Sequence, residues 1–182
     1  EALKRAPACR SYEELLQISD AVYIRSNPSL HYKQVKQALQ CGKHVLCESP
    51  ITLQADQCRE LFELAEKNHC ILVEGIKTAY STAYYRLILL AKTGKIGKII
   101  SVDATCTSIK KNIANVDITW NSMSEWGPTA LLPVFQILGL DYKQVEFAAH
   151  FLDKEKKFDA FSKISFLYPN AVASIKVGCG AK

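Results

Sequence analysis

The sequence contains no long apolar run. No stretch approaches the roughly 18 consecutive apolar residues from which a membrane-spanning helix is predicted. The first ten residues include Glu1, Lys4, Arg5 and Arg10, so the pattern of a secretory leader is missing as well. We therefore expect no membrane partner and a cytoplasmic location.

Clusters of basic residues are also missing. Lys and Arg number 23 against 18 Asp and Glu, a formal net charge of +5, and they are spread along the chain. A nucleic-acid-binding domain concentrates such residues on one face or in one segment, so we expect no nucleic-acid partner. The hydrophobic share of 48% and the charged share of 23% are typical of a globular protein. The 182 residues suffice for one large domain or two small ones.

The seven cysteines form no Cys-x-x-Cys pair. Several of them, such as Cys47 and Cys70, lie within apolar runs, which is typical of small buried residues in a reducing compartment. Cys41, His44 and Cys47 have a spacing compatible with zinc, but a structural zinc site needs a fourth ligand and no second cluster supplies one. We expect no metal site.

Short apolar runs alternate with helical patterns in the first half of the chain. We expect strands over residues 21–24, 44–47 and 70–73; the run 21–24 is wholly apolar, which is typical of a strand buried on both faces, and 70–73 is expected to be buried as well. Asn27 is a candidate N-cap for the first intervening helix, and apolar residues recur at helical spacing over 52–68. This strand–helix–strand order predicts parallel pairing through right-handed crossovers, as in a doubly wound α/β sheet.

The hydrophobic pattern changes period in the second half of the chain. Residues 100–107 alternate between apolar and polar, which is typical of a strand with one face left open. Pro169-Asn170 predicts a hairpin turn. The fold class predicted is therefore α/β over residues 1–79, followed by an α+β domain with a mainly antiparallel sheet over residues 80–182. The further elements expected here are a helix over 129–138 and strands over 145–152, 158–168 and 171–179.

Four segments in order resemble the Gfo/Idh/MocA oxidoreductases. Gly42–Pro50 reads Gly-Lys-His-Val-Leu-Cys-Glu-Ser-Pro and is similar to the family signature Gly-Lys-His-Val-x-x-Glu-Lys-Pro. Upstream, Tyr23–His31 resembles the apolar strand and Thr/Ser-Pro-Asn-x-x-His of the family, with Pro and Asn exchanged. Val73-Glu74 and Gly94–Gly97 resemble the end of the next strand and the link into the second domain.

The resemblance implies a Rossmann dinucleotide-binding domain, of which residues 1–79 form the C-terminal part, and an NAD or NADP cofactor. It implies that residues 80–182 form part of a domain for substrate binding and oligomerisation. The Gly-x-Gly-x-x-Gly loop with which family members begin does not occur in this sequence, so we expect an internal fragment of a longer protein. By resemblance, the cofactor-binding residues are Ser26, Asn27, Pro28, His31, Glu48, Ser49 and Pro50.

The candidate catalytic residues depart from the family pattern. Ser49 stands where the signature has lysine, and a hydroxyl brings no positive charge. Glu125 and Thr129 match a later Asp-x-Gly-x-His/Tyr segment, and Lys77 is a second candidate for the missing charge. Each has a plainer interpretation: Glu125 as a carboxylate favoured at a helix start, Lys77 as an exposed loop residue, and His31 as a buried helix-face histidine.

Two functions remain open from the sequence. The first is an NAD(P)-dependent oxidoreductase that acts on a sugar, inositol or related polyol with an atypical catalytic set. The second is a catalytically degenerate relative that binds a nucleotide or sugar. Because Phe161, Leu167 and Val172 lie on one open face of the second sheet, and because this sheet forms the family's oligomer interface, we expect a homo-oligomer.

Overall fold

The computed structural model describes residues 8–109, 121–153 and 158–180. The chain divides into two compact units, Glu1–Gly75 and Ile76–Lys182, which are described separately. The predicted boundary after residue 79 falls within a short 3-10 helix of the second unit, Lys77–Tyr80. Among the described residues, no helix is long and apolar enough to cross a membrane.

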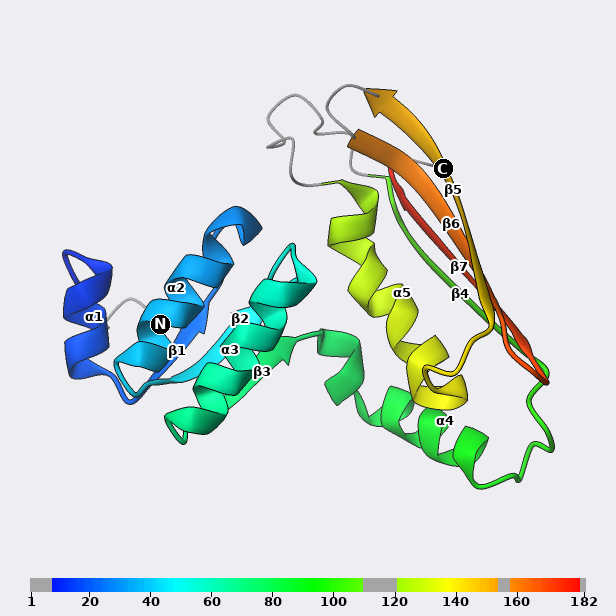
Figure 1. Ribbon diagram of the computed structural model, residues 1–182, viewed down its shortest axis with the longest axis horizontal. Coiled ribbons are helices and arrows are strands. Elements are labelled where there is room, and N and C mark those ends of the chain that lie inside the picture. The colour runs from blue at the N-terminus through cyan, green and yellow to red at the C-terminus, as the bar shows by residue number, and fades with distance from the viewer. Residues whose placement is uncertain (1–7, 110–120, 154–157, 181–182) are drawn as a thin grey trace. The chain divides into compact units, whose positions relative to one another are not determined.

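The first unit is a three-stranded parallel sheet with helices packed on it (Figure 1). The strand order is β1-β2-β3 and both pairs are parallel, as predicted. Asn27 caps α2 and Pro28 occupies its first turn, as predicted. The elements are α1 (Tyr12–Ile18), β1 (Ala21–Ile24), α2 (Pro28–Gln40), β2 (His44–Glu48), α3 (Ala55–Lys67) and β3 (Leu72–Gly75).

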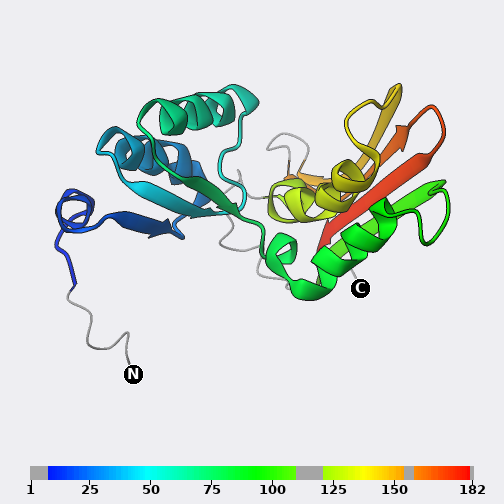
Figure 2. The ribbon, with the colours of Figure 1, turned by 90° about the horizontal axis from the view of Figure 1, so that it is seen from below.

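Burial of the first sheet is one-sided in this chain, which corrects the expectation of strands buried on both faces. Along β1 and β2, exposed and buried side chains alternate: Val22 and Val45 are buried, whereas Tyr23 and Leu46 are exposed. The strands follow one another in a single direction, so right-handed crossovers carry α2 and α3 to the same face. Figure 2 shows both helices on that face.

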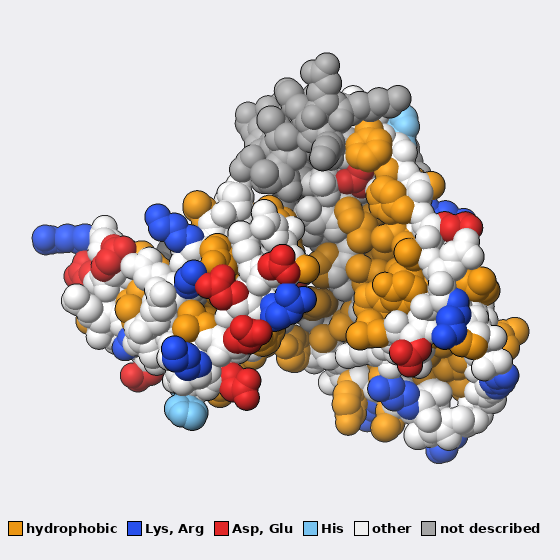
Figure 3. All heavy atoms as spheres, in the orientation of Figure 1, with side chains coloured by type: hydrophobic (Ala, Val, Ile, Leu, Met, Phe, Trp, Pro, Cys, Tyr) orange, Lys and Arg blue, Asp and Glu red, His pale blue; other side chains and the backbone are white. Residues whose placement is uncertain are grey.

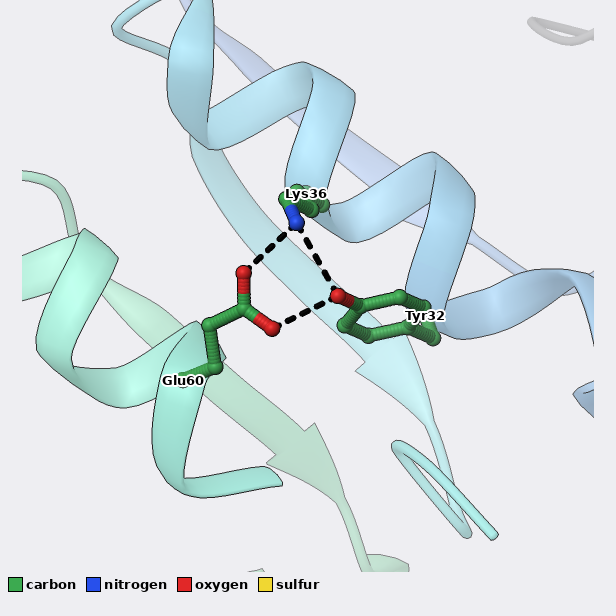
Figure 4. Close-up of polar contacts among 3 residues, drawn as sticks. All are labelled: Tyr32, Lys36 and Glu60. Atoms are coloured by element: carbon green, nitrogen blue, oxygen red, sulfur yellow. Dashed lines mark hydrogen bonds and ion pairs between the residues drawn. The ribbon is translucent and has the colours of Figure 1, made fainter. Parts of the chain in front are cut away.

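A polar cluster joins the two crossover helices at the surface (Figure 4). The Lys36 Nζ of α2 lies 2.6 Å from Glu60 Oε1 of α3, and the Tyr32 hydroxyl donates to Glu60 Oε2 at 2.6 Å. Lys36 also donates to the Tyr32 hydroxyl at 3.0 Å. The hydrogen bonds from Lys36 and then Tyr32 lower the pKa of the Glu60 carboxyl. The cluster links the two helices at the surface, beside the buried core.

The second unit is a four-stranded mixed sheet with α5 packed on one face. The strand order is β4-β7-β6-β5; β6 pairs antiparallel with β5 and β7, as predicted for 158–168 and 171–179, and β4 pairs parallel with β7. The core lies between α5 and β7, where Val134 meets Ala173, Ile175 and Val177. The elements that follow Lys77–Tyr80 are α4 (Thr82–Lys92), β4 (Ser101–Ser108), α5 (Ser122–Leu138), β5 (Gln144–Asp153), β6 (Phe158–Leu167) and β7 (Val172–Cys179).

Apolar surface is concentrated in the second unit. Hydrophobic side chains form a broad band over α5 and the neighbouring sheet edge (Figure 3). Val145 and Phe147 of the edge strand β5 pair in register with Phe166 and Ile164, so they lie on the same face of the sheet as α5. They are 50% and 57% exposed. On the opposite face Leu167 and its neighbours are exposed as well, as the alternating pattern predicted.

Candidate functional site

The carboxyl ends of the three parallel strands meet at one edge of the first sheet. The chain continues from β1 into Ser26–Pro28 and from β2 into Ser49–Ile51, while Glu74 lies near the end of β3. In open α/β sheets, ligands bind outside this edge. Every candidate cofactor residue named from the sequence lies at this edge or on the helix that begins there.

The loop after β1 forms the N-terminus of α2. The Asn27 side chain accepts hydrogen bonds from the Ser29 backbone N–H at 3.0 Å and from the Ser29 hydroxyl at 2.8 Å. The Ser26 hydroxyl donates to the side-chain oxygen of Gln34, about two helical turns further along the chain. Asn27 is exposed and Ser26 and Pro28 are half-buried. The sequence therefore places a polar helix start at the strand ends, a position suited to an anion or a ribose.

His31 connects the loop after β1 with the loop after β2. Its ring is 1% exposed. Nδ1 lies 2.8 Å from the carbonyl oxygen of Pro50, and Nε2 lies 3.1 Å from the carbonyl oxygen of Ser26. A carbonyl oxygen only accepts, so the ring donates through whichever nitrogen carries a proton. Because His31 is buried and contacts both loops, its role in this structure is to hold them together. Its role in cofactor binding stays a prediction.

Glu74 holds the loop after β2 from the neighbouring strand. Its Oε1 accepts a hydrogen bond from the Ser49 hydroxyl at 2.8 Å and a second from the Ile51 backbone N–H at 3.2 Å. The intervening Ser49-Pro50 peptide bond is cis. Ser49 and Glu74 are both half-buried, whereas Ile51 is 3% exposed and belongs to the core. The Ser49 hydroxyl, the candidate catalytic group, thus has a carboxylate as its acceptor.

Glu48 lies on the opposite face of the sheet from Glu74. In the parallel register Cys47 pairs with Glu74 and Glu48 pairs with Gly75, so the two carboxylates alternate. Glu48 accepts a hydrogen bond from the Tyr23 hydroxyl of β1. This bond raises the pKa of Tyr23, so the phenol stays protonated and remains a donor at neutral pH. Glu48 is half-buried at the strand ends, where a sugar hydroxyl can donate to it.

Gly75 allows the close approach of β3 to this turn. A Cβ added there would lie 3.2 Å from the carbonyl oxygen of Cys47 and 3.4 Å from the Cα of Glu48, both backbone atoms. Glycine therefore lets β3 lie close to the backbone of Cys47 and Glu48 without a steric contact.

Glu125 and Thr129 lie one turn apart on α5 in the second unit. The Cys179 thiol, at the end of β7, donates to Glu125 Oε2 over 3.2 Å. Burial, and then this hydrogen bond, raise the pKa of the thiol to about 12, so it stays protonated and keeps donating. Thr129 is half-buried. Lys77 is exposed on the 3-10 helix that begins the same unit.

A second carboxylate lies near the start of α5. Asp159 is 3% exposed and accepts hydrogen bonds from the Ser122 and Ser162 hydroxyls, the latter at 2.7 Å. Both serines are fully buried. Both donors bind the same oxygen, Oδ2, of the buried carboxylate, and the bond from Ser122 attaches the first residue of α5 to β6. Among the described residues, no group of three or more His, Cys, Asp or Glu is placed to hold a metal ion.

The strand-end residues fit one part of a dinucleotide. Ribose hydroxyls both donate and accept, and the edge offers the Glu48 carboxylate, the Asn27 amide and the start of α2. The pyrophosphate needs a glycine-rich loop, and the sequence has none of the Gly-x-Gly-x-x-Gly type. The chain therefore carries groups suited to the ribose side of the cofactor.

The structure brings the candidate cofactor-binding residues together at one edge of the first unit. The candidate catalytic residues Lys77, Glu125 and Thr129 belong to the second unit. His31 contacts the carbonyl oxygens of Ser26 and Pro50, and Ser49, which precedes Pro50 in the chain, donates to Glu74. Sequence reasoning used Glu74 only as part of the resemblance and did not assign it to the site. A carboxylate at the end of an apolar strand was the signal that could have identified it. The other functional contacts that reasoning did not anticipate involve Tyr23, Cys179 and Asp159.

Comparison with known proteins gives the family. Residues 2–76 match the model of the Gfo/Idh/MocA oxidoreductase family, which has an NAD-binding Rossmann fold. A dTDP-3,4-didehydro-2,6-dideoxy-alpha-D-glucose 3-reductase of Streptomyces violaceoruber is 34% identical over 102 residues, which are 55% of this chain and 30% of that protein. The D-xylose 1-dehydrogenase (NADP(+)) of Hypocrea jecorina is 32% identical over 114 residues, 62% of this chain and 27% of that enzyme.

A solved structure shares the fold of both units. GenD2 from gentamicin A biosynthesis, in complex with NAD, superposes with a TM-score of 0.87 at 16% identity. The superposition covers 100% of this chain and 54% of that protein, so the chain spans about half the length of this relative. The family match and the two sugar-enzyme relatives agree with one another, and the shared fold is consistent with both: residues 2–76 of the chain belong to the Gfo/Idh/MocA oxidoreductase family.

Proposed function

We propose that the complete protein is an NAD(P)-dependent oxidoreductase that acts on a sugar, inositol or related polyol. One observation carries the proposal: the Glu48-Ser49-Pro50 turn, at the carboxyl edge of the parallel sheet, presents a half-buried carboxylate and a half-buried hydroxyl, and the turn is held by His31 and Glu74. The relatives named above as a sugar reductase and a sugar dehydrogenase support this substrate class.

The chain's residues would divide the work as follows. Glu48 accepts hydrogen bonds from the cofactor ribose, and the start of α2, at Ser26, Asn27 and Pro28, lies beside it. His31 keeps the two strand-end loops in register through Pro50 and Ser26. The bound nicotinamide supplies the hydride acceptor or donor.

In the second unit, Glu125 orients a substrate hydroxyl, because its carboxylate is held by a thiol that stays protonated. Thr129, one turn away, adds a hydroxyl for the same substrate. Lys77 supplies positive charge that Ser49 lacks.

Turnover with a panel of sugars, inositols and polyols, using NAD⁺ and NADP⁺ in turn, tests the function. We expect reduced nicotinamide to form with at least one substrate. Glu125→Gln should raise KM for that substrate, and Lys77→Ala should lower kcat, while calorimetric cofactor affinity stays unchanged. Cofactor binding without turnover of any panel member would contradict the proposal and favour the degenerate sugar- or nucleotide-binding relative, which the uncharged Ser49 and Thr129 also suit.

We further propose that the second sheet mediates a homo-oligomer. Its face away from α5 exposes Phe161, Leu167 and Val172 at 36%, 48% and 50%. Leu167 and Val172 are directly paired neighbours on this face, and exposed apolar residues of this kind often mark a contact surface. Sedimentation of the complete protein should show an oligomer that Leu167→Lys dissociates. A monomer at all concentrations would contradict this assembly.

A further inference from the structure

The Ser49 hydroxyl and the Glu74 carboxylate form a hydrogen-bonded pair between the ends of two neighbouring strands. Ser49 Oγ donates to Glu74 Oε1 at 2.8 Å. The Ile51 backbone N–H donates to the same oxygen at 3.2 Å, which fixes the orientation of the carboxylate. The pair is half-buried, in the turn that the family signature marks with lysine. The Glu74 carboxylate therefore contacts the Ser49 hydroxyl and is held in that position by the Ile51 N–H.

A hydroxyl in this position can do what an isolated serine cannot. Alone, a serine side chain is a poor base at neutral pH. When an adjacent carboxylate accepts its proton, the hydroxyl oxygen can take a proton from another alcohol in the same step. We propose that Ser49 and Glu74 form a proton relay that performs, in this chain, the proton transfer of the oxidoreductase reaction. The inference rests on the proposed function.

The relay is balanced in both directions. In oxidation, the substrate carbon loses a hydride to the nicotinamide and its hydroxyl loses a proton to Ser49 Oγ. The proton of Ser49 passes to Glu74 Oε1, and Glu74 later releases it to water. The alcohol becomes a carbonyl compound, and each turnover yields one reduced nicotinamide and one proton. In reduction the same proton moves from Glu74 through Ser49 to the carbonyl oxygen.

A purely structural role of Glu74 makes a different prediction. If the carboxylate only holds the turn, the amide of Glu74→Gln suffices, because its oxygen still accepts from Ser49 and Ile51. A relay needs an acceptor that takes up a proton, and a neutral amide does not. Ser49→Thr keeps the hydroxyl, whereas Ser49→Ala removes it. Glu74→Gln and Ser49→Thr are thus the two variants that separate the roles.

The experiment uses the complete protein with the substrate and nicotinamide that give turnover. We expect Glu74→Gln and Ser49→Ala each to lower kcat about a hundredfold or more, the usual worth of a positioned acid or base. KM and calorimetric cofactor affinity should stay within about threefold, and Ser49→Thr should retain most of the activity. Glu60→Gln, which removes the same charge from the surface of the first unit, is the matched control and should match the unsubstituted protein.

An infrared measurement tests the pair without turnover. The carboxylate band that disappears in Glu74→Gln should shift in Ser49→Ala, because the hydroxyl donor is lost, and should stay unchanged in Glu60→Gln. An unshifted band, or a Glu74→Gln variant with full kcat, would overturn the relay. Loss of cofactor affinity in Glu74→Gln would overturn it too, because the lower kcat would then reflect a disturbed cofactor site and not the loss of a proton acceptor. Lack of turnover in the unsubstituted protein would instead contradict the proposed function.

Discussion

Replacing His31 tests whether the two strand-end loops depend on its contacts. Its ring is buried and faces the carbonyl oxygens of Pro50 and Ser26 at 2.8 and 3.1 Å. His31→Leu fills most of the same volume with no donor, which leaves a buried acceptor unpaired and should cost about 2 kcal/mol of unfolding free energy. His31→Ala also opens a cavity, and the total loss should reach about 3–4 kcal/mol.

Chemical denaturation measures the loss, and hydrogen exchange of the β1 and β2 amides locates it in the first unit. His69→Asn is the control, because His69 is exposed and its φ of 54° is one that asparagine tolerates. It should change the stability by less than about 0.5 kcal/mol. A His31→Leu variant as stable as the unsubstituted protein would refute the reasoning, since the ring would then act only by filling space.

Three further predictions concern other features of the fold. The pKa of Glu60 is lowered by its partners, so its contribution to stability is present above the ordinary carboxyl pKa and is lost as pH falls through the lowered value; Glu60→Gln should flatten acid denaturation in that range, and high salt should reduce the difference. Gly75→Ala should destabilise the protein by about 1–2 kcal/mol because the new Cβ meets backbone, whereas Gly127→Ala meets only the flexible end of a methionine and should be neutral or stabilising by up to about 1 kcal/mol in thermal unfolding. Burial raises the pKa of Cys47 to about 12, so iodoacetamide at pH 8 should label the exposed Cys41 quickly and Cys47 only after unfolding, as peptide mass spectrometry would show; rapid labelling of Cys47 in the folded protein would contradict its burial.

Local patterns predicted the elements of the first unit closely. The cap Asn27 and the following proline gave the start of α2, and the apolar runs gave β1 and β2 within one residue. The third strand begins at Leu72, two residues after the predicted start, because an apolar run alone does not mark where pairing begins. The hydrophobic pattern of the strands also did not show that α2 and α3 would cover only one face of the sheet.

The second unit shows where local reasoning fails. The predicted helix began at Thr129, after Pro128, but α5 begins at Ser122 and includes both Pro128 and Pro133. Proline is expected to end a helix, and here packing of α5 on the sheet outweighs that local preference. The parallel pairing of β4 with β7 joins segments about seventy residues apart in sequence, as Asp103 and Ser174 show, and no local signal encodes it.

The candidate site was predictable in its location and not in its contacts. The signature turn identified Glu48 and Ser49, because those residues occupy its motif positions. The partners of these residues depend on strand register: Tyr23 reaches Glu48 and Glu74 reaches Ser49 only because β1, β2 and β3 pair in parallel. His31 was assigned to the cofactor by motif, and its burial against two carbonyl oxygens became visible only in three dimensions.

Hydrogen exchange with and without cofactor tests the central claim most directly, namely that the carboxyl edge of the first sheet holds the nicotinamide ribose. The complete protein is compared alone and with saturating NADH or NADPH. The account predicts that one of these cofactors slows exchange in residues 26–31 and 48–51, while the helix Tyr12–Ile18 stays unchanged. Saturable cofactor binding with no added protection of either loop would contradict the account.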